Sequence, residues 1–427
     1  MTCSLIPVLL FSTALMVSAK DHSVPTFRKI QITDKFWSEG ANIGDFNRDG
    51  KMDVVSGPFW YEGPDFKIAH EYYPATEKFT VKNADGSTQE IPGFEGALGT
   101  NNTYSKNFIA FTGDINRDKW PDILILGFPG EASWWFENPK GKEGHWERHV
   151  AIEVTDNESP TFADLTGDKK PEIVCSSKGF LGYAQPDGKH PTNLWTWHTI
   201  SPDNKYHRFT HGLGIGDVNG DGRKDILEKD GWWEQPKSLK GDPIWPQHKY
   251  PFAPGMGGAQ MYVYDVNGDG LNDVITSVAA HGYGLVWHEQ LPRKNKSDEI
   301  QFHEHLILNK TNAPNEEGVS FSQLHAIDLV DMNGDGLKDI VTGKRFWAHG
   351  AKGDPEPDAP AVLYWFELVR GKDRSVKFIP HLIDNNSGIG TQVVAADVNG
   401  DKLPDVIVGN KKGTFVHLQE KQKHPKK

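Results

Sequence analysis

Short apolar runs, rather than long amphipathic stretches, dominate the hydrophobic pattern of this chain. Two such runs repeatedly flank a polar turn, as in Tyr262–Tyr264 before one turn and Val274–Ile275 after it. Continuously apolar runs of this length are typical of strands that are buried on both faces. An aromatic run, for example Trp232–Trp233, follows most of these pairs. The pattern therefore predicts an all-β chain of repeated antiparallel strands.

The polar turn between the paired runs is itself a repeat. In the copy from Asp217 to Asp225, oxygen-bearing side chains occupy positions one, three, five and nine, and Gly222 occupies position six. Seven copies start at residues 45, 114, 164, 217, 265, 331 and 397, and intervals of roughly 50 to 70 residues are typical of propellers and solenoids. A fourth strand, often ending in histidine, follows the aromatic run. We predict a seven-bladed β-propeller of four-stranded blades over residues 20–420, with each acidic turn between a first and a second strand.

The two ends of the repeat region complement each other. The last repeat stops after its third strand, Phe415–Leu418, whereas Phe27–Ile32 ahead of the first turn resembles a fourth strand without a repeat of its own. We therefore expect the N-terminal strand to join the last blade and close the ring.

The acidic turns have the side chains of calcium loops, because alternating carboxylates and amides can surround a hard cation while glycine takes the bend. The alternative is a metal-free hairpin in which these side chains bond their own backbone. Both interpretations make the turns structural. The copy at Asp164 is degenerate, with Thr166 at position three. In the other six copies the predicted Ca²⁺ ligands are Asp45, Asn47, Asp49, Asp53, Asp114, Asn116, Asp118, Asp122, Asp217, Asn219, Asp221, Asp225, Asp265, Asn267, Asp269, Asp273, Asp331, Asn333, Asp335, Asp339, Asp397, Asn399, Asp401 and Asp405.

Charge and the two termini narrow the classes of protein. The chain has 46 Lys and Arg against 58 Asp and Glu and no basic stripe, so its charge does not favour binding to nucleic acid. Residues 1–19 resemble a signal peptide with cleavage after Ala19, and their apolar run is too short to span a membrane. Residues 421–427 form a basic tail. We expect a secreted or periplasmic protein.

Counting from the acidic turns predicts where other side chains gather. In a propeller, residues about six before each turn lie at the opposite face, and the loops after each second strand return to that face. We expect one channel mouth to collect both groups, which include Glu39, Glu158, His211 and His325 from the first and Trp60, Lys229, His281, Lys344, Arg345 and His349 from the second.

The side chains expected at this mouth suit two kinds of chemistry. Imidazoles bind transition metals such as zinc, and carboxylates either bind metal or act as bases. The nearby cations and aromatic rings, among them Trp60, Lys229 and Arg345, suit an anionic or sugar-like substrate. The alternative is a polar channel that holds water, with Trp60 packed between blades.

Two resemblances to known families add to this interpretation. The repeat, with Asp217–Gly222 as its clearest copy, resembles the FG-GAP/VCBS repeats of integrin alpha subunits and many secreted bacterial proteins, which implies a propeller with calcium loops. Four segments, Thr210–Asp217, Ala280–Gly284, Gln323–Asp328 and Gly343–His349, resemble the propeller domain of aldos-2-ulose dehydratases.

The second resemblance implies a secreted lyase that eliminates water from a keto-sugar with the help of a metal. His211, His281 and His325 would then bind zinc or another divalent transition metal, and Glu158, Lys344 or His349 would serve as base or acid. The alternative is a non-catalytic extracellular propeller that binds a glycan or a protein through the same face. A stoichiometric transition metal that is lost in a His211→Ala, His281→Ala double variant would favour the enzyme.

Overall fold

The computed structural model describes residues 24–75, 78–83, 85–92, 104–295 and 298–420. The expected signal peptide, residues 1–19, and the basic tail, residues 421–427, lie outside the described residues. Within the described residues the fold is all-β, as predicted: the helical structure there is one short 3-10 helix, η2 (Gly350–Lys352). None of the helices in this part of the chain has the length and apolarity that a membrane span needs.

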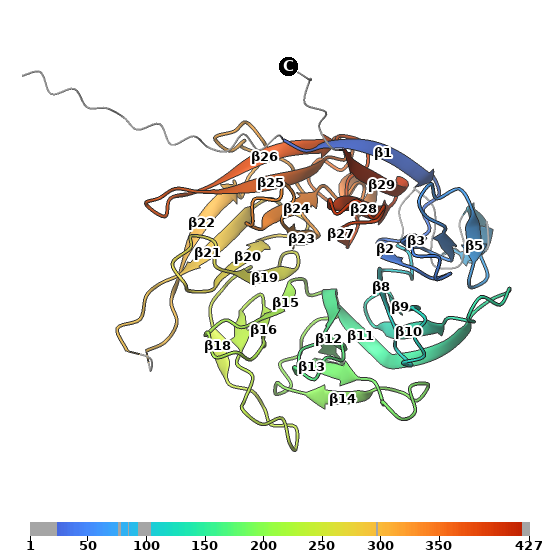
Figure 1. Ribbon diagram of the computed structural model, residues 1–427, viewed down its shortest axis with the longest axis horizontal. Helices are drawn as coiled ribbons and strands as arrows, with labels where there is room; N and C mark the ends of the chain where they lie inside the picture. Colours follow the sequence, from blue (N-terminus) through green and yellow to red (C-terminus); the bar gives the residue numbers. More distant parts are fainter. Residues whose placement is uncertain (1–23, 76–77, 84, 93–103, 296–297, 421–427) are drawn as a thin grey trace, which may run out of the picture.

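Three sheets contain four antiparallel strands each. Figure 1 shows the sheets around a common centre, with β2, β23 and β27 near it and β1, β5 and β26 further out. In sheet order the strands are β2 (Asn42–Gly44), β3 (Asp53–Ser56), β4 (Phe59–Tyr61) and β5 (Ala69–Glu71); β23 (Ile327–Val330), β24 (Asp339–Gly343), β25 (Leu363–Arg370) and β26 (Val376–Asp384); and β27 (Val393–Ala396), β28 (Asp405–Asn410), β29 (Gly413–Glu420) and β1 (Thr26–Thr33).

A seven-stranded sheet is built around one long strand, β11 (Glu147–Ala163). The first part of β11 pairs with β10 and its last part with β12, so the strand continues from one four-stranded group into the next. The other members are β8 (Ile109–Gly113), β9 (Asp122–Leu126), β10 (Glu131–Glu137), β12 (Glu172–Ser177), β13 (Phe180–Gln185) and β14 (Thr196–Thr199).

An eight-stranded sheet likewise consists of two four-stranded groups. They are joined where β15 and β19 pair in parallel through Gly214 with Met261 and Ile215 with Tyr262. The groups are β15 (Leu213–Gly216), β16 (Asp225–Glu228), β17 (Gly231–Trp233) and β18 (Gln247–Lys249), and β19 (Met261–Tyr264), β20 (Asp273–Ser277), β21 (Leu285–Gln290) and β22 (Phe302–Leu308). A separate hairpin, β6 (Lys78–Lys82) and β7 (Thr88–Pro92), lies in the first insertion.

The acidic turns lie where the sequence places them, between the first and second strands of a group. The turn from Asp331 to Asp339, for example, joins β23 to β24, and these strands pair from Ile327–Thr342 to Val330–Asp339. The N-terminal strand β1 pairs antiparallel with β29, from Thr26–Glu420 to Thr33–Thr414. The two ends of the described chain therefore share one sheet (Figure 1).

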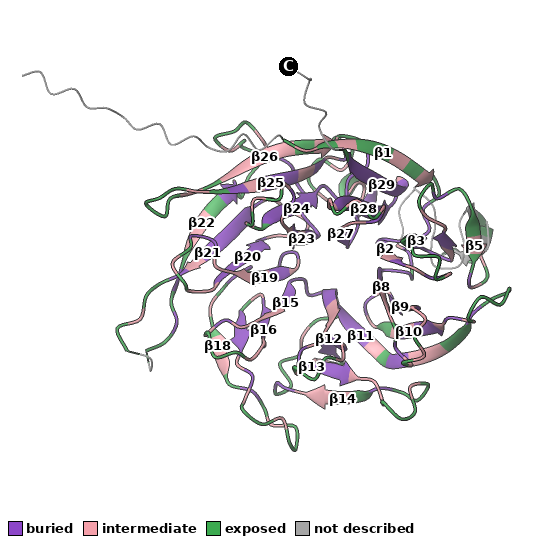
Figure 2. Cartoon of the chain, in the orientation of Figure 1, coloured by how far each residue is buried: buried purple, intermediate pink, exposed green. Residues whose placement is uncertain are grey.

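The second strand of each group is the most deeply buried. All residues of β3, β9, β12, β16, β20, β24 and β28 are buried, and Figure 2 shows buried residues in purple. Neighbouring sheets share hydrophobic clusters: Val341 and Trp365 from one sheet pack with Val406 and Phe415 from the next. Because each buried aliphatic or aromatic side chain contributes about 1.5–3 kcal/mol, these clusters hold the inner face of every sheet in place.

Histidines of the outer strands have a structural role. The third-strand aromatic ring stacks on the fourth-strand histidine of the same sheet, with ring centroids 4.0 Å apart for Trp60 and His70 and 4.3 Å apart for Trp365 and His381. In several groups a third-strand glutamate binds this histidine: Glu289 Oε2 lies 2.8 Å from His305 Nε2, and Glu367 Oε2 lies 2.8 Å from His381 Nε2. This explains why so many fourth strands carry histidine.

Candidate functional site

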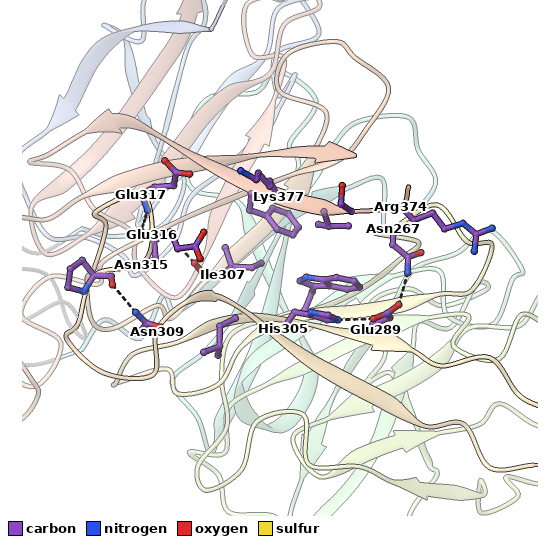
Figure 3. Close-up of a pocket in the computed structure, with 16 residues that line it drawn as sticks. Asn267, Glu289, His305, Ile307, Asn309, Asn315, Glu316, Glu317, Arg374 and Lys377 are labelled. Atoms are coloured by element: carbon purple, nitrogen blue, oxygen red, sulfur yellow. Dashed lines mark hydrogen bonds and ion pairs between the residues drawn. The ribbon is translucent and has the colours of Figure 1, made fainter. Parts of the chain in front are cut away.

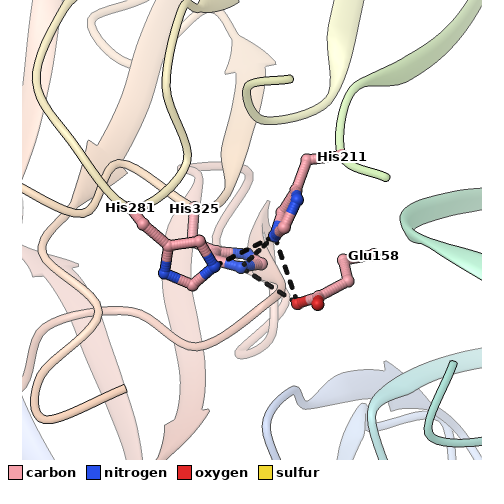
Figure 4. A group of neighbouring side chains, drawn as sticks. All are labelled: Glu158, His211, His281 and His325. Atoms are coloured by element: carbon pink, nitrogen blue, oxygen red, sulfur yellow. Dashed lines mark hydrogen bonds and ion pairs between the residues drawn. The ribbon is translucent and has the colours of Figure 1, made fainter. Parts of the chain in front are cut away.

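Four side chains from separate segments of the chain point toward one another (Figure 4). They are Glu158, His211, His281 and His325, and one ligand atom of each lies within 4.8 Å of the others. His211 Nε2 is 3.1 Å from both His281 Nε2 and His325 Nε2. Glu158 Oε2 is 3.3 Å from His211 Nε2 and 3.2 Å from His325 Nε2. Counting back six residues from the acidic turns thus leads to three of these four residues, and the return loop after β20 supplies His281.

The geometry of this histidine cluster fits a transition metal. Zinc binds imidazole nitrogen and carboxylate oxygen at about 2.0–2.1 Å, which separates tetrahedral ligands by roughly 3.3 Å. Four of the six separations are 3.1–3.3 Å, and all six lie within 4.8 Å. Converging acceptor atoms repel one another unless a proton or a cation lies between them. The donor set of three imidazoles and one carboxylate is one that zinc and related divalent ions accept.

Protonation states in the cluster also favour metal binding. Burial raises the pKa of Glu158, but the adjacent His211 and His325 outweigh this and hold it well below its usual value. Burial lowers the pKa of His325 well below its ordinary value, and the Arg345 guanidinium lowers it further. Burial likewise lowers the pKa of His281. An ionised Glu158 carboxylate and neutral imidazoles at His281 and His325 are the forms in which these groups bind metal.

A distortion of strand β11 aims Glu158 at the cluster. The register between β11 and β12 shifts between Asp156 and Thr161, and Asn157 has a φ of 79°. Such bulges change the direction of a side chain relative to a regular strand. The main-chain N–H of Glu158 donates to Thr210 O at 2.9 Å, which places it beside the residue preceding His211.

Main-chain hydrogen bonds connect the loops that carry the histidines. His211 N donates to Met256 O at 2.7 Å, and Gln323 N donates to Gly282 O at 2.7 Å. The first bond fixes His211 ahead of β15, and the second joins the loop of His281 to the segment that precedes β23. Each bond joins loops of different four-stranded groups. The positions of the histidines therefore depend on how these groups are placed relative to one another.

A buried ion pair borders the cluster. The Arg345 guanidinium and the Glu39 carboxylate are each 1% exposed, and Arg345 Nη2 lies 3.0 Å from Glu39 Oε2. Arg345 Nη1 donates to His325 Nε2 at 2.9 Å and lies 3.7 Å from Glu158 Oε2. Arg345, a predicted substrate-binding residue, thus occupies the His325 Nε2 lone pair that a metal would need, so metal binding requires Nη1 to turn away from this nitrogen.

The insertion after β24 contributes two more side chains. His349 Nδ1 lies 2.8 Å from Asp354 Oδ2, and the His349 ring is centred 4.4 Å from that of His281. Asp354 Oδ1 lies 3.3 Å from His281 Nδ1. The structure therefore brings His349 next to the cluster, although its side chain remains 40% exposed.

Three other predicted site residues lie elsewhere. Lys344 is fully buried under the insertion, where its Nζ donates to Ser322 Oγ at 2.7 Å and burial lowers its pKa to about 8. Lys229 pairs with Asp230 and lines a different groove. Trp60 packs in a hydrophobic cluster with Phe46 and Val55 and stacks on His70, which is the packing alternative considered above.

The sequence does not predict Asp354 as a site residue, because Asp354 belongs to no repeat. It does not predict Lys411 either. The Lys411 side chain is 2% exposed, and its Nζ donates to Trp347 O and Ala348 O and lies 5.3 Å from the centre of the Tyr104 ring. Glu39 stood at the counted position but received no role. The available signal for Asp354 was its place in an insertion rich in Gly, Pro and Asp, where functional loops often occur.

In the acidic turns, side-chain oxygens bind backbone N–H groups. Asp331 Oδ1 accepts from Gly334 N at 2.7 Å and Asp335 N at 3.1 Å, and its Oδ2 accepts from Gly336 N at 2.9 Å. Asp335 Oδ1 accepts from Leu337 N at 2.7 Å. These bonds fold the turn and use both lone pairs of Asp331 Oδ1, whereas Asp331 Oδ2 and Asp335 Oδ1 each keep a second lone pair that a cation can use. The calcium prediction therefore stays a prediction.

The ninth residue of the turn is an anchor. Asp339 is fully buried, its Oδ2 accepts from Met332 N at 2.8 Å, and its Oδ1 accepts from Leu368 N at 2.9 Å. Burial, with a smaller contribution from the nearby Asp335 and Asp331, raises its pKa to about 7. The equivalent Asp225 binds Val218 N and Gln235 N in the same way. Position nine thus ties the turn to the third strand whether or not the turn holds an ion.

The structure also contains a groove that none of the four cluster residues lines. It has a volume of ≈ 770 Å³ and runs between β22 and β26, with Glu316, Glu317, Arg374 and Lys377 along its sides (Figure 3). Within it Asn267 Nδ2 donates to Glu289 Oε1 at 3.0 Å, and Glu289 Oε2 lies 2.8 Å from His305 Nε2. These contacts belong to the aromatic–histidine–glutamate groups of the outer strands, so we assign the groove no chemistry.

Comparisons with known proteins bear on the repeat more than on the site. Comparison with curated proteins gives no match. Three of the similar solved structures are an Agrocybe aegerita lectin that recognises non-reducing terminal N-acetylglucosamine (15% identity, 93% of this chain and 86% of the other, TM-score 0.42), the rhamnogalacturonan lyase YesW (13%, 93% and 75%, 0.39) and the Tc holotoxin pore of Photorhabdus luminescens (15%, 80% and 16%, 0.37). At these scores they carry no argument about the site.

The family comparison agrees with the repeat seen in the sequence. The model of the FG-GAP-like repeat matches residues 114–175 and 331–408, which is less than half of the 427 residues. Each matched segment begins at one acidic turn and includes the next, at residues 114 and 164 and at residues 331 and 397. The chain therefore carries FG-GAP-like repeats in an all-β fold.

Proposed function

We propose that this protein is a secreted, metal-dependent carbohydrate lyase that removes water from a keto-sugar by β-elimination. The observation that carries the proposal is the convergence of three imidazoles and one carboxylate, whose ligand atoms all lie within 4.8 Å of one another and four of whose separations are 3.1–3.3 Å. The resemblance of the four segments around these residues to aldos-2-ulose dehydratases supports the reaction class. The scaffold we propose is a seven-bladed propeller closed by β1, with calcium in the acidic turns and a signal peptide at residues 1–19.

A site with three protein ligands suits a catalytic metal better than a site with four. Catalytic zinc sites keep three protein ligands and one open position, whereas structural sites use all four. In the proposal His211, His281 and His325 hold a divalent ion such as zinc, which when bound polarises the carbonyl of the sugar. Glu158 faces the same point from the fourth side, and its lowered pKa keeps it in the unprotonated form that a base needs.

The residues of the chain divide the proton movements between them. Glu158 takes the proton from the carbon next to the carbonyl, and Arg345 donates a hydrogen bond to the oxygen that gains charge. The carbon–oxygen bond on the next carbon breaks, and a double bond forms between the two carbons. The departing hydroxyl needs a proton to leave as water. We assign this proton to His349, since it lies beside His281 and its side chain reaches solvent.

Metal content and product formation test this proposal together. Protein from which calcium has been exchanged should retain about one transition metal per chain, and the His211→Ala, His281→Ala double variant should retain none. Incubation of the metal-loaded protein with an aldos-2-ulose should produce the ultraviolet absorbance of an enone. Metal binding without any enone from a panel of keto-sugars would contradict the lyase.

The second candidate function is an extracellular binding propeller with a structural metal. It is favoured by the burial of the cluster, since Glu158, His211 and His325 are 9%, 3% and 0% exposed, which is typical of a closed four-ligand site. In that case Glu158 is the fourth ligand, and the ion connects segments that precede β15 and β23 and follow β20. The two functions assign different roles to Glu158, and mutation of Glu158 can distinguish them.

A further inference from the structure

The three imidazoles of the histidine cluster are buried to different extents. The side chains of His211 and His325 are 3% and 0% exposed, whereas that of His281 is 25% exposed. Packing therefore restricts the first two imidazoles more than the third. His281 also comes from a return loop, while His211 and His325 each stand directly before an inner strand. If His281 is to present one nitrogen reliably to the cluster, another group must hold its ring.

Asp354 is placed to hold this ring. Its carboxylate is 3% exposed and lies 3.3 Å from His281 Nδ1, on the side of the imidazole opposite the Nε2 that faces His211. In the described part of the chain, Nδ1 of all three histidines is buried without a well-aligned hydrogen bond, but only Nδ1 of His281 has a carboxylate oxygen as near as 3.3 Å, that of Asp354. A carboxylate thus stands behind the one histidine of the three that is least restrained by packing.

We propose that Asp354 is a positioning residue of the metal centre, which keeps the imidazole proton of His281 on Nδ1 and so presents the Nε2 lone pair to the metal. A neutral imidazole carries one proton, and the partner at one nitrogen decides which nitrogen is left free to bind metal. This inference deepens the proposed function and rests on its metal centre. It also makes the insertion after β24, rather than the repeats alone, part of the site.

The surrounding contacts keep Asp354 in place. Its carboxylate accepts from the main-chain N–H of His349 at 3.0 Å and lies 2.8 Å from His349 Nδ1. The main-chain oxygen of the next residue, Pro355, accepts from Ser322 Oγ at 2.9 Å. Lys411 Nζ binds the carbonyl oxygens of Trp347 and Ala348, at the start of the insertion, at 2.9 and 3.1 Å. The insertion is therefore anchored on both sides of the carboxylate.

Zinc affinity of the full chain tests the inference without any substrate. Asp354→Asn removes the charge and can turn an N–H₂ toward His281 Nδ1, which favours the tautomer with the proton on Nε2. We expect zinc affinity, measured by competition with a chromophoric chelator, to fall roughly 10- to 100-fold, as for other outer partners of metal-binding histidines. Asp358→Asn, an isosteric change at an exposed position of the same insertion, should stay within about twofold of the wild type.

Two further measurements separate positioning from a general loss of structure. The melting temperature of the zinc-depleted Asp354→Asn variant reports on folding, and the visible spectrum of its Co²⁺ form reports on ligand geometry, which we expect to change. His349→Gln removes the other partner of Asp354 and should leave zinc affinity within about threefold of the wild type. An equal loss in both variants would mean that Asp354 acts only by holding the insertion, and would overturn the inference.

The remaining outcomes are distinct. A wild-type chain that binds no transition metal refutes the proposed metal centre itself. One zinc per chain with equal affinity in wild type and Asp354→Asn refutes only the role of Asp354. Two zinc ions per chain, one of which is lost in both Asp354→Asn and His349→Gln, would show a second ion between His281, His349 and Asp354 and would also overturn the positioning role.

Discussion

Replacing Glu158 by glutamine separates a base from a metal ligand. The substitution keeps the size of the side chain and leaves the main-chain bond from Glu158 N to Thr210 O in place. It removes the charge that faces His211 Nε2 at 3.3 Å and His325 Nε2 at 3.2 Å. The fold of β11 should therefore be unchanged, and any effect reflects the carboxylate itself.

The two roles predict different magnitudes. Loss of a general base lowers the rate by about 10²- to 10⁴-fold, equivalent to about 3–5 kcal/mol in the transition state, while metal affinity stays within about threefold. Loss of a fourth ligand instead weakens metal binding by more than the roughly 10- to 100-fold that follows loss of an outer partner. As a base, Glu158 is dispensable for metal binding and essential for elimination.

The assay measures zinc affinity by chelator competition and enone formation by ultraviolet absorbance on the same preparations. Glu153→Gln is the matched control, because Glu153 lies on the same strand and is exposed; it should change neither value. Glu158→Gln protein that binds zinc as tightly as the wild type and still forms enone at a wild-type rate would refute both roles. A large loss of affinity would refute the base and support the binding propeller with a structural ion.

Three other predictions concern the scaffold and the ion pair. Deleting residues 26–33 removes the whole pairing of β1 with β29 and should lower the melting temperature sharply; an unchanged curve would contradict closure of the ring by β1. Burial raises the pKa of Asp339 to about 7, whereas an unfolded aspartate titrates near 3.9. The folded state therefore binds more protons between about pH 4 and 7, so without calcium the free energy of unfolding should fall as pH rises through this window, and Asp339→Asn should reduce that slope in urea titrations. Glu39→Gln leaves the buried Arg345 charge without its 3.0 Å partner and should cost about 3–5 kcal/mol, while the Glu39→Gln, Arg345→Met double variant should recover part of this loss in the same titrations.

The local pattern of the chain determined the repeat and much of the site. Apolar runs on both sides of an acidic turn specify two buried strands and their connection, since strand formation depends on residues close in sequence. Because each acidic turn follows directly on the first strand of its group, one step of six residues back from the turn reached Glu158, His211 and His325, which the structure brings together. Because the turn repeats, residues at the same number of positions before it lie at the same face of the fold.

Only the tertiary structure decided which loops complete the site. Trp60 and His281 both follow second strands, yet Trp60 packs in a hydrophobic cluster while His281 meets His211 and His325. Asp354 comes from an insertion outside the repeat, and Glu39 meets Arg345 across 306 positions of the chain. Contacts between loops of different groups depend on how the sheets are placed around the common centre and on how each loop folds. No local pattern encodes those two properties, so the partners of His281 and Arg345 became visible only once the chain was folded.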